Sequence, residues 1–134
     1  MCLILRNRKA CLRPWNKSRI RYKWMSVNGS SLCSPSQGTE VKRSKGKLVL
    51  VSNAKSKIAS GKYCGASHGI HVHATLKSAM MSRWYHCRLF KVRCYGFLRS
   101  GGWEEPPITK EETWERIEFI IPRGKKHPVP ISQK

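Results

Sequence analysis

Thiol and imidazole side chains are concentrated between residues 64 and 87 of this sequence. Thiolate and imidazole are ligands that Zn²⁺ prefers, and histidines two residues apart on a strand share one face. The sequence contains no Cys-x-x-Cys pair, and the spacing matches no familiar zinc finger. Buried cysteines and polar histidines are therefore the favoured explanation, and we expect no cofactor. The alternative is a zinc site, with the candidate ligands Cys64, His68, His71, His73 and Cys87.

Nucleophilic catalysis is a second kind of chemistry that these residues could support. A cysteine beside a histidine can form a thiolate–imidazolium pair, and His68 follows Cys64 by four residues. This pattern is short and generic. Glu115 and Glu118 fall on opposite faces of a predicted strand, so they cannot act together there. We therefore expect a protein without enzymatic activity and keep a small thiol- or metal-dependent enzyme as an alternative.

Basic side chains interleaved with aromatic rings give the strongest chemical signal. The chain of 134 residues has 27 Lys and Arg against 7 acidic residues, which gives a net charge of +20. Cations displace counterions from phosphates, and aromatic rings stack on exposed bases. The predicted nucleic-acid contacts are Arg6, Arg8, Lys9, Arg13, Trp15, Lys17, Arg19, Arg21, Tyr22, Lys23, Lys42, Arg43, Lys45, Lys47, Lys55, Lys57, Lys62, Tyr63, Lys91 and Arg93.

The charges are distributed unevenly along the chain. Every acidic residue except Glu40 lies within residues 104–118, and a basic strand pattern precedes that stretch. On strands, Arg21 and Lys23 would project from one face, as would Lys91 and Arg93. We expect a basic sheet face that follows a phosphate backbone, with an acidic loop that balances or covers it. No recognised RNA- or DNA-reading motif is present, so backbone contact is favoured over sequence-specific reading.

The elements that must position these residues follow from the hydrophobic periodicity. A basic arm is expected over residues 1–19, a single domain over 20–121 and a flexible basic tail over 122–134, with three prolines and no apolar pattern. Thr75 stands where a helix N-cap belongs. The predicted fold class is α+β, a small, mostly antiparallel sheet of about five strands with one helix packed on it. The predicted strands are 19–27, 47–52, 69–74, 87–98 and 113–121, and the predicted helix is 76–85.

The compartment is predicted from the N-terminus and the cysteines. The apolar start at residues 1–5 ends at Arg6 and is far shorter than the core of a signal peptide. No run approaches the roughly 18 apolar residues of a membrane span. We therefore expect an intracellular, cytoplasmic protein with no membrane partner, whose six cysteines are reduced thiols.

One segment of the chain carries a resemblance to other proteins. Residues 69–97 read GIHVHATLKSAMMSRWYHCRLFKVRCYGF, preceded by Tyr22-Lys23 and Ser34-Pro35. This pattern, over residues 20–121, resembles a loose group of small phage and prokaryotic proteins, with 69–79 as its distinctive part. The resemblance implies a phage or viral accessory protein, in the cytoplasm or nucleus of a host cell, and carries no activity. Some such domains are similar to ADP-ribosyltransferases, but the Arg, Ser-Thr-Ser and Glu-x-Glu series is missing here.

Three functions from different classes follow from these observations. The leading one is a small, highly basic nucleic-acid-binding accessory protein of viral or phage origin, which binds DNA or RNA through a basic arm and sheet face. The second is a phage-type inhibitor that binds a host protein. The third is the small thiol- or metal-dependent enzyme.

Overall fold

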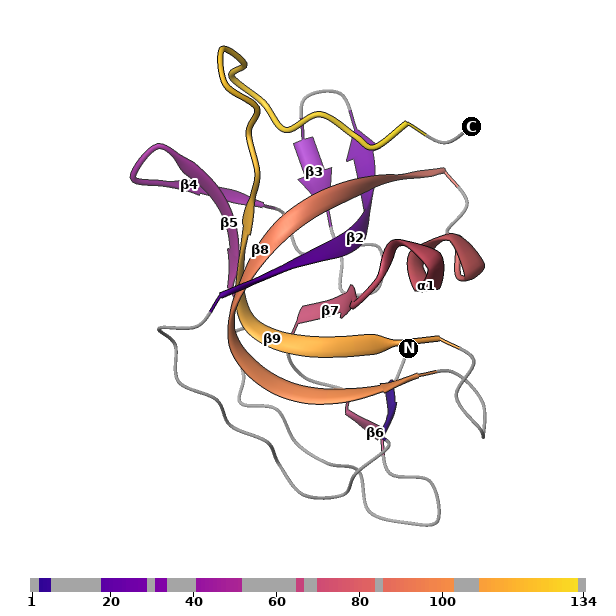
Figure 1. The fold of residues 1–134 in the computed structure, drawn as a ribbon. Helices are drawn as coiled ribbons and strands as arrows, with labels where there is room; N and C mark the ends of the chain where they lie inside the picture. The colour runs from indigo at the N-terminus through magenta and orange to yellow at the C-terminus, as the bar shows by residue number, and fades with distance from the viewer. Residues whose placement is uncertain are drawn as a thin grey trace.

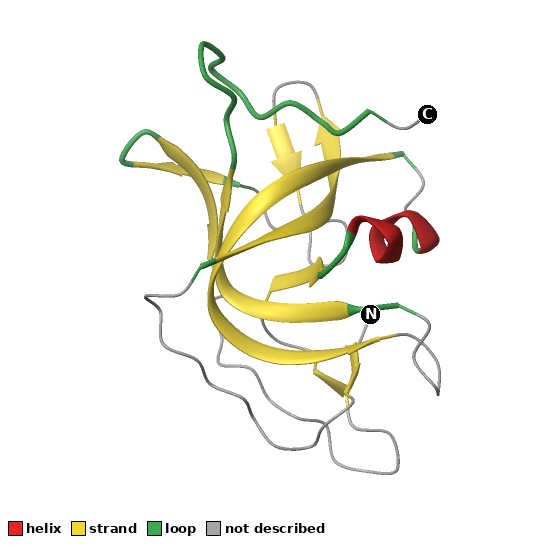
Figure 2. Ribbon diagram, viewed as in Figure 1, coloured by secondary structure: helices red, strands yellow, loops and turns green. Residues whose placement is uncertain are grey.

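The computed structural model describes residues 3–5, 18–28, 31–33, 41–51, 65–66, 70–83, 86–102 and 109–132. The described part of the chain is dominated by β-strands and contains one short helix (Figure 2). Its elements are β1 (Leu3–Leu5), β2 (Arg19–Asn28), β3 (Ser31–Cys33), β4 (Lys42–Ser44), β5 (Lys47–Val51), β6 (Gly65–Ala66), β7 (Ile70–His73), α1 (Leu76–Met81), β8 (Cys87–Gly102) and β9 (Glu111–Phe119).

The sheet closes on itself into a small barrel-like structure (Figure 1). Strand β2 pairs with β8, β8 with β9, β9 with β7, and β7 with β2, and every one of these pairings is antiparallel. The length of β8 makes the closure possible, because residues 87–94 pair with β2 while residues 92–101 pair with β9. The prediction of an antiparallel sheet with one helix is confirmed. The sheet, however, has more strands than expected and is closed.

The shorter strands lie outside this closed circuit. Strands β5 and then β4 extend from β9, β3 extends from β2, and β1 and β6 extend from the end of β8. The alternation of side chains did not predict β3 or β4, because both lie in polar segments without an apolar period. Strand β1 lies within the predicted N-terminal arm, and β8 extends to Gly102, past the predicted end of this strand at residue 98.

Two apolar clusters lie on opposite faces of β2 and β8. The larger one is enclosed by the closed sheet and includes Met25, Phe90, Val92 and Ile117. The smaller one consists of Trp24, Ala79 and Leu89, with Tyr22, Cys87 and Ile131 packed against it. Because neighbouring strand residues point to opposite faces, β2 contributes Met25 to one cluster and Trp24 to the other.

Helix α1 covers the smaller cluster. Its N-cap is Thr75, whose hydroxyl accepts a hydrogen bond from the Ser78 amide at 3.1 Å, as predicted. The Trp24 indole N–H donates to the Ala79 carbonyl at 2.9 Å and joins the helix to β2. The helix ends at Met81, earlier than predicted. No helix in the described part of the chain has the length and apolar character needed to cross a membrane.

The segment after β9 returns along the outside of the sheet. It has no regular secondary structure over the described residues 120–132. The Ile131 amide donates to the Leu89 carbonyl at 2.7 Å, and the Ile131 side chain packs against the smaller apolar cluster. The segment predicted as a flexible tail therefore contacts the sheet through Ile131.

Candidate functional site

The hairpin formed by β4 and β5 carries four exposed cations within six residues. Every residue from Lys42 to Lys47 is exposed. Lys45 and Gly46 have φ angles of 50° and 79° and form the two-residue turn between paired Ser44 and Lys47. Positive φ at both central residues is the pattern of a type I′ turn, which suits the twist of paired strands.

The base of this hairpin is held on two sides. On one side, the Val41 amide donates to the Leu32 carbonyl at 2.9 Å, which attaches the chain to β3. On the other side, residues 49–51 pair with β9. Val41 and Leu48 also pack against the enclosed apolar cluster. The cations at the tip are therefore carried by a firmly attached ribbon.

A second basic segment lies at the same end of the sheet. Val49 pairs with Glu118, so the start of β5 and the end of β9 lie at the same end of the sheet, and the hairpin and the loop after β9 project from that end in different directions (Figure 1). In that loop, the Lys125 amide donates to the Pro122 carbonyl at 3.0 Å, and Gly124 has a φ of 83°. A glycine with positive φ at the third position is typical of a type II turn.

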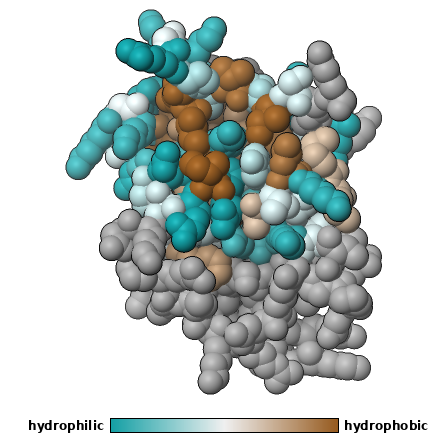
Figure 3. Space-filling view, in the orientation of Figure 1, coloured by the Kyte–Doolittle hydropathy of each residue, from teal (hydrophilic) through white to brown (hydrophobic). Residues whose placement is uncertain are grey.

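Together these two segments form what we call the basic surface. Hydrophilic side chains gather over the hairpin and over the loop after β9 (Figure 3). All of the cations concerned are exposed. The residues of the basic surface are Lys42, Arg43, Lys45, Lys47, Arg123, Lys125 and Lys126.

One acidic side chain, Glu118 of β9, lies at the margin of the basic surface. Its carboxylate accepts from Arg116 at 3.1 Å, lies 3.5 Å from the Lys47 ammonium, and accepts from the Tyr95 hydroxyl at 3.5 Å. Arg93 is its register partner on β8. The carboxylate therefore neutralises part of the charge next to the hairpin.

Lys91 and Arg93 extend the exposed positive charge along β8. Both are exposed, and the Ile120 amide donates to the Lys91 carbonyl at 3.4 Å, which places Lys91 beside the start of the basic loop. Arg93 donates to the Ser18 hydroxyl at 3.3 Å. Arg19 is also exposed and donates to the Ser18 carbonyl at 3.2 Å.

The other predicted pair of strand cations lies on the opposite face. Arg21 and Lys23 share a face with Met25, which belongs to the enclosed cluster. Arg21 donates to the Glu112 carboxylate, which also accepts from the Trp114 indole at 3.1 Å. The structure therefore does not combine Arg21 and Lys23 with Lys91 and Arg93 into a common basic face.

Lys23 connects β2 to β7 from within the protein. Its side chain is 4% exposed, and its ammonium donates to the His71 carbonyl at 2.7 Å. Strands β2 and β7 share the single residue pair Tyr22–His73, so this bond supports a short seam of the barrel. Burial lowers the pKa of Lys23 to about 8, since desolvation disfavours the ammonium. A side chain this deeply buried cannot reach a phosphate.

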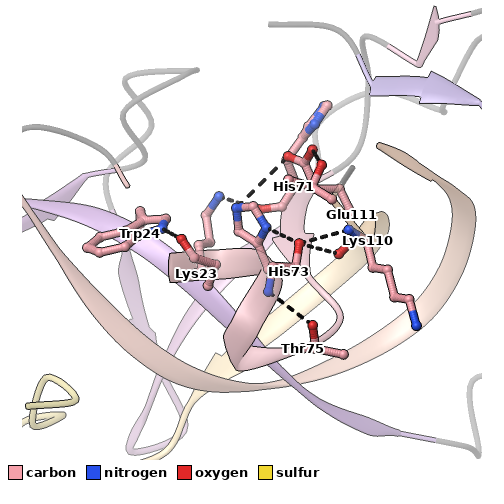
Figure 4. Close-up of polar contacts among 10 residues, drawn as sticks. Lys23, Trp24, His71, His73, Thr75, Lys110 and Glu111 are labelled. Atoms are coloured by element: carbon pink, nitrogen blue, oxygen red, sulfur yellow. Dashed lines mark hydrogen bonds and ion pairs between the residues drawn. The ribbon is translucent and has the colours of Figure 1, made fainter. Parts of the chain in front are cut away.

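A buried polar cluster adjoins this seam (Figure 4). His73 Nδ1 lies 2.9 Å from the Ser78 hydroxyl, and His73 Nε2 lies 3.9 Å from the Glu111 carboxylate. The Ser78 hydroxyl accepts from the Lys110 amide at 2.8 Å and lies 3.0 Å from the Lys110 carbonyl. Thr109 donates to Glu111 at 2.7 Å. The cluster thus joins β7, α1 and the start of β9.

This serine–histidine–glutamate set has the residue types of a hydrolase triad but not its accessibility. Ser78 is 3% exposed, and its oxygen already accepts from Lys110. Its single proton goes either to His73 or to the Lys110 carbonyl, so the hydroxyl is committed to contacts inside the protein. The arrangement can fix three elements together, and its serine is buried rather than open to solvent.

Two histidines and two cysteines, His71, His73, Cys87 and Cys94, are in environments that suppress their charged forms. Burial first, and then the Lys23 charge, lowers the pKa of His71 and of His73 to about 4. Burial raises the pKa of the Cys87 and Cys94 thiols. Within the described residues, no group of three or more potential ligands is placed to hold a metal ion. Cys64 and His68 lie outside the described residues, so zinc binding by the full candidate set stays a prediction.

The remaining predicted contacts fall into two groups. Tyr22 is half-buried against the smaller apolar cluster. The others lie outside the described residues: Arg6, Arg8, Lys9, Arg13, Trp15, Lys17, Lys55, Lys57, Lys62 and Tyr63.

Sequence reasoning did not select Arg123, Lys125 and Lys126, because they were taken as part of a flexible tail. One signal could have identified them. Gly124 lies between Arg123 and Lys125, two positions after Pro122, and this pattern is typical of a turn.

The chain was also compared with known proteins. No family model, curated protein or solved structure matches it.

Proposed function

We propose that this protein binds nucleic acid through contacts between its basic surface and the phosphate backbone. The observation that carries the proposal is the pair of exposed basic segments, 42–47 and 123–126, at one end of the sheet. Neither segment contains an acidic residue. Phosphate contacts of this kind supply affinity without sequence information.

The energetic basis is the release of counterions. Each phosphate that a Lys or Arg neutralises contributes about −0.9 to the slope of log affinity against log salt on duplex DNA. The basic surface, with Lys91 and Arg93 beside it, offers enough cations for several such contacts. Affinity should therefore be high at low salt and fall steeply as salt rises.

The test is a titration of fluorescently labelled DNA and RNA at a series of salt concentrations. Several phosphate contacts predict a loss of about 10³-fold or more between 50 and 200 mM salt. Should affinity hardly change over this range, or should no binding occur at low salt, the proposal is abandoned.

A protein partner is the second candidate, favoured by exposed apolar side chains on α1. Leu76, Met80 and Met81 are 42%, 39% and 53% exposed, and Leu76 and Met80 share one helix face. Pull-down from a nuclease-treated lysate tests this candidate. It requires a stoichiometric protein that binds the wild type and is lost from a Met80→Glu, Met81→Glu variant. Capture that nuclease abolishes supports the first candidate instead.

A further inference from the structure

The β4–β5 hairpin has cations on both of its faces. Ser44 pairs with Lys47, so Lys42 and Lys47 lie on one face, whereas Arg43, paired with Leu48, lies on the other. All residues from 42 to 47 are exposed, so neither face of the tip is covered by described parts of the protein. A strand pair that only extended a phosphate-binding sheet would need cations on a single face. Cations on both faces are suited to a binding site that has negative charges on both sides of the ribbon.

The groove of a nucleic-acid duplex provides such a site. Its two walls carry phosphates, and the major groove of B-form DNA, about 12 Å wide, admits a two-stranded β-ribbon. Side chains project from the two faces of a strand pair, so a ribbon that enters the groove edge-first directs the cations of its two faces at the two phosphate walls. The major groove of an A-form RNA duplex is deep and too narrow for side chains to enter.

The composition of the basic surface points away from single strands. Proteins that bind single strands use aromatic rings as stacking platforms for the bases. The segments that form the basic surface read Lys-Arg-Ser-Lys-Gly-Lys and Arg-Gly-Lys-Lys, without an aromatic residue. The nearest described tyrosine, Tyr95, is directed to Glu118 through its hydroxyl.

From these observations, and on the basis of the proposed function, we infer that the basic surface binds double-stranded DNA. The β4–β5 ribbon lies in the major groove, and Arg123, Lys125 and Lys126 contact the phosphates beside it. The type I′ turn and the attachment of the hairpin base to β3 and β9 hold the ribbon in this form before binding. Such preorganisation lowers the entropic cost of association.

The experiment compares a hairpin variant with a charge-matched helix variant. The hairpin variant is Lys42→Gln, Arg43→Gln, Lys45→Asn. Asparagine tolerates positive φ at position 45 and so keeps the turn while removing the charge. The control, which we call the helix variant, is Lys77→Gln, Arg83→Gln, Arg88→Gln. It removes the same number of exposed cations from α1, from the segment just after it and from the start of β8, all of which lie outside the basic surface. Circular dichroism and thermal unfolding check that both variants fold as the wild type does.

Each protein is titrated with a labelled DNA duplex of about 20 base pairs, roughly two helical turns. The single strand of the same sequence and the corresponding RNA duplex serve as competitors. We expect the DNA duplex to bind the wild type at least about tenfold more tightly than either competitor. The loss of three phosphate contacts should reduce the salt slope of the hairpin variant by about 2 to 3, and the helix variant should keep the wild-type slope.

The outcomes separate this inference from the proposed function. Single-stranded DNA or duplex RNA binding as tightly as duplex DNA, with steep salt dependence, overturns the duplex-DNA inference and leaves the proposed function standing. Equal loss of affinity by the hairpin and helix variants also overturns the placement of the contacts on the basic surface and leaves only binding through the total charge. No salt-dependent binding to any of the three nucleic acids overturns both.

Discussion

Lys23 and Lys45 are the same residue type with opposite roles in this protein. Lys23 is enclosed by the sheet, and its ammonium donates to a backbone carbonyl. Lys45 stands at the tip of the hairpin, where every neighbour along the turn is exposed. The net charge of +20 is therefore not a measure of binding capacity. What matters is how much of that charge lies on the surface without a carboxylate beside it.

The physical reason for the difference is desolvation. A charge removed from water must be compensated by a partner and by hydrogen bonds. Arg21 accordingly meets Glu112 inside the sheet, and the described acids Glu111 and Glu112 serve internal contacts. Charges on the hairpin remain solvated and need no partner to compensate for burial, although Lys47 lies 3.5 Å from the Glu118 carboxylate, so they are available to an external polyanion.

The largest predicted effect concerns an internal charge. Glu112→Ala removes the acceptor of both Arg21 and the Trp114 indole and leaves two largely buried donors without a partner. We expect the free energy of unfolding in urea to fall by about 2 to 4 kcal/mol, given that Arg21 keeps some solvent contact. The control, Glu115→Ala on the same strand, should cost less than about 1 kcal/mol. Equal losses of unfolding free energy in the two variants would show that the contacts of Glu112 with Arg21 and Trp114 contribute no more to stability than those of Glu115.

The next effect is a pH dependence of stability that arises from His73. Its pKa is about 4 in the folded protein against 6.5 in an unfolded chain, so the unfolded chain binds more protons between these values. The contribution of His73 to stability should therefore be constant well above pH 6.5 and fall as the pH drops towards 4. The loss attributable to this residue is up to about 3 kcal/mol.

Urea unfolding at a series of pH values measures this loss. His73→Gln should flatten the profile in part, with the remainder due to His71, whose pKa is also lowered to about 4. His127→Gln, in the exposed loop, is the control and should leave the profile unchanged. A wild-type profile without a decline between pH 6.5 and 4 contradicts the burial of His73.

A smaller effect is expected from Ser78. Ser78→Ala removes the oxygen that accepts from the Lys110 amide and the partner of His73 Nδ1. Leaving these buried groups unpaired should cost about 1 to 3 kcal/mol in chemical denaturation. Nucleic-acid affinity at a temperature where the variant is folded should equal that of the wild type. A selective loss of affinity would place the polar cluster in the binding site.

The smallest effect sharpens the account of the surface. Glu118→Gln removes the carboxylate beside Lys47 and Arg116. The Lys47 side chain is 61% exposed, and ion pairs of exposed cations contribute about 0.2 to 1 kcal/mol. Affinity for duplex DNA should therefore rise by about two- to fivefold at low salt. Fluorescence anisotropy detects this difference. A decrease in affinity would mean that Glu118 positions the hairpin cations for binding.

The periodicity of the sequence was sufficient for most of the regular elements. The alternation around Tyr22 and Phe90, and Thr75 as an N-cap, correctly located β2, β8 and the start of α1. Alternation also showed that Arg21, Lys23 and Met25 share a face. It could not show which face is enclosed, because Trp24 on the other side is equally buried beneath α1.

The closure of the sheet and the shape of the basic surface depend on contacts between distant residues. Phe97 and Cys94 both join the enclosed cluster because Gly96, with a φ of 72°, interrupts the alternation of β8. Strand β4 contains only polar residues and is identified by its pairing with β5. The register between Val49 and Glu118 brings the base of the hairpin and the start of the loop after β9 to the same end of the sheet. Local patterns do not encode such pairings.

The central claim is tested most directly by the salt dependence of duplex DNA binding for the hairpin variant against the helix variant. We predict that the slope of log affinity against log salt becomes shallower by about 2 to 3 for the hairpin variant and stays at the wild-type value for the helix variant. Equal slopes for the two variants would contradict the claim that the exposed hairpin, rather than the total charge, makes the phosphate contacts.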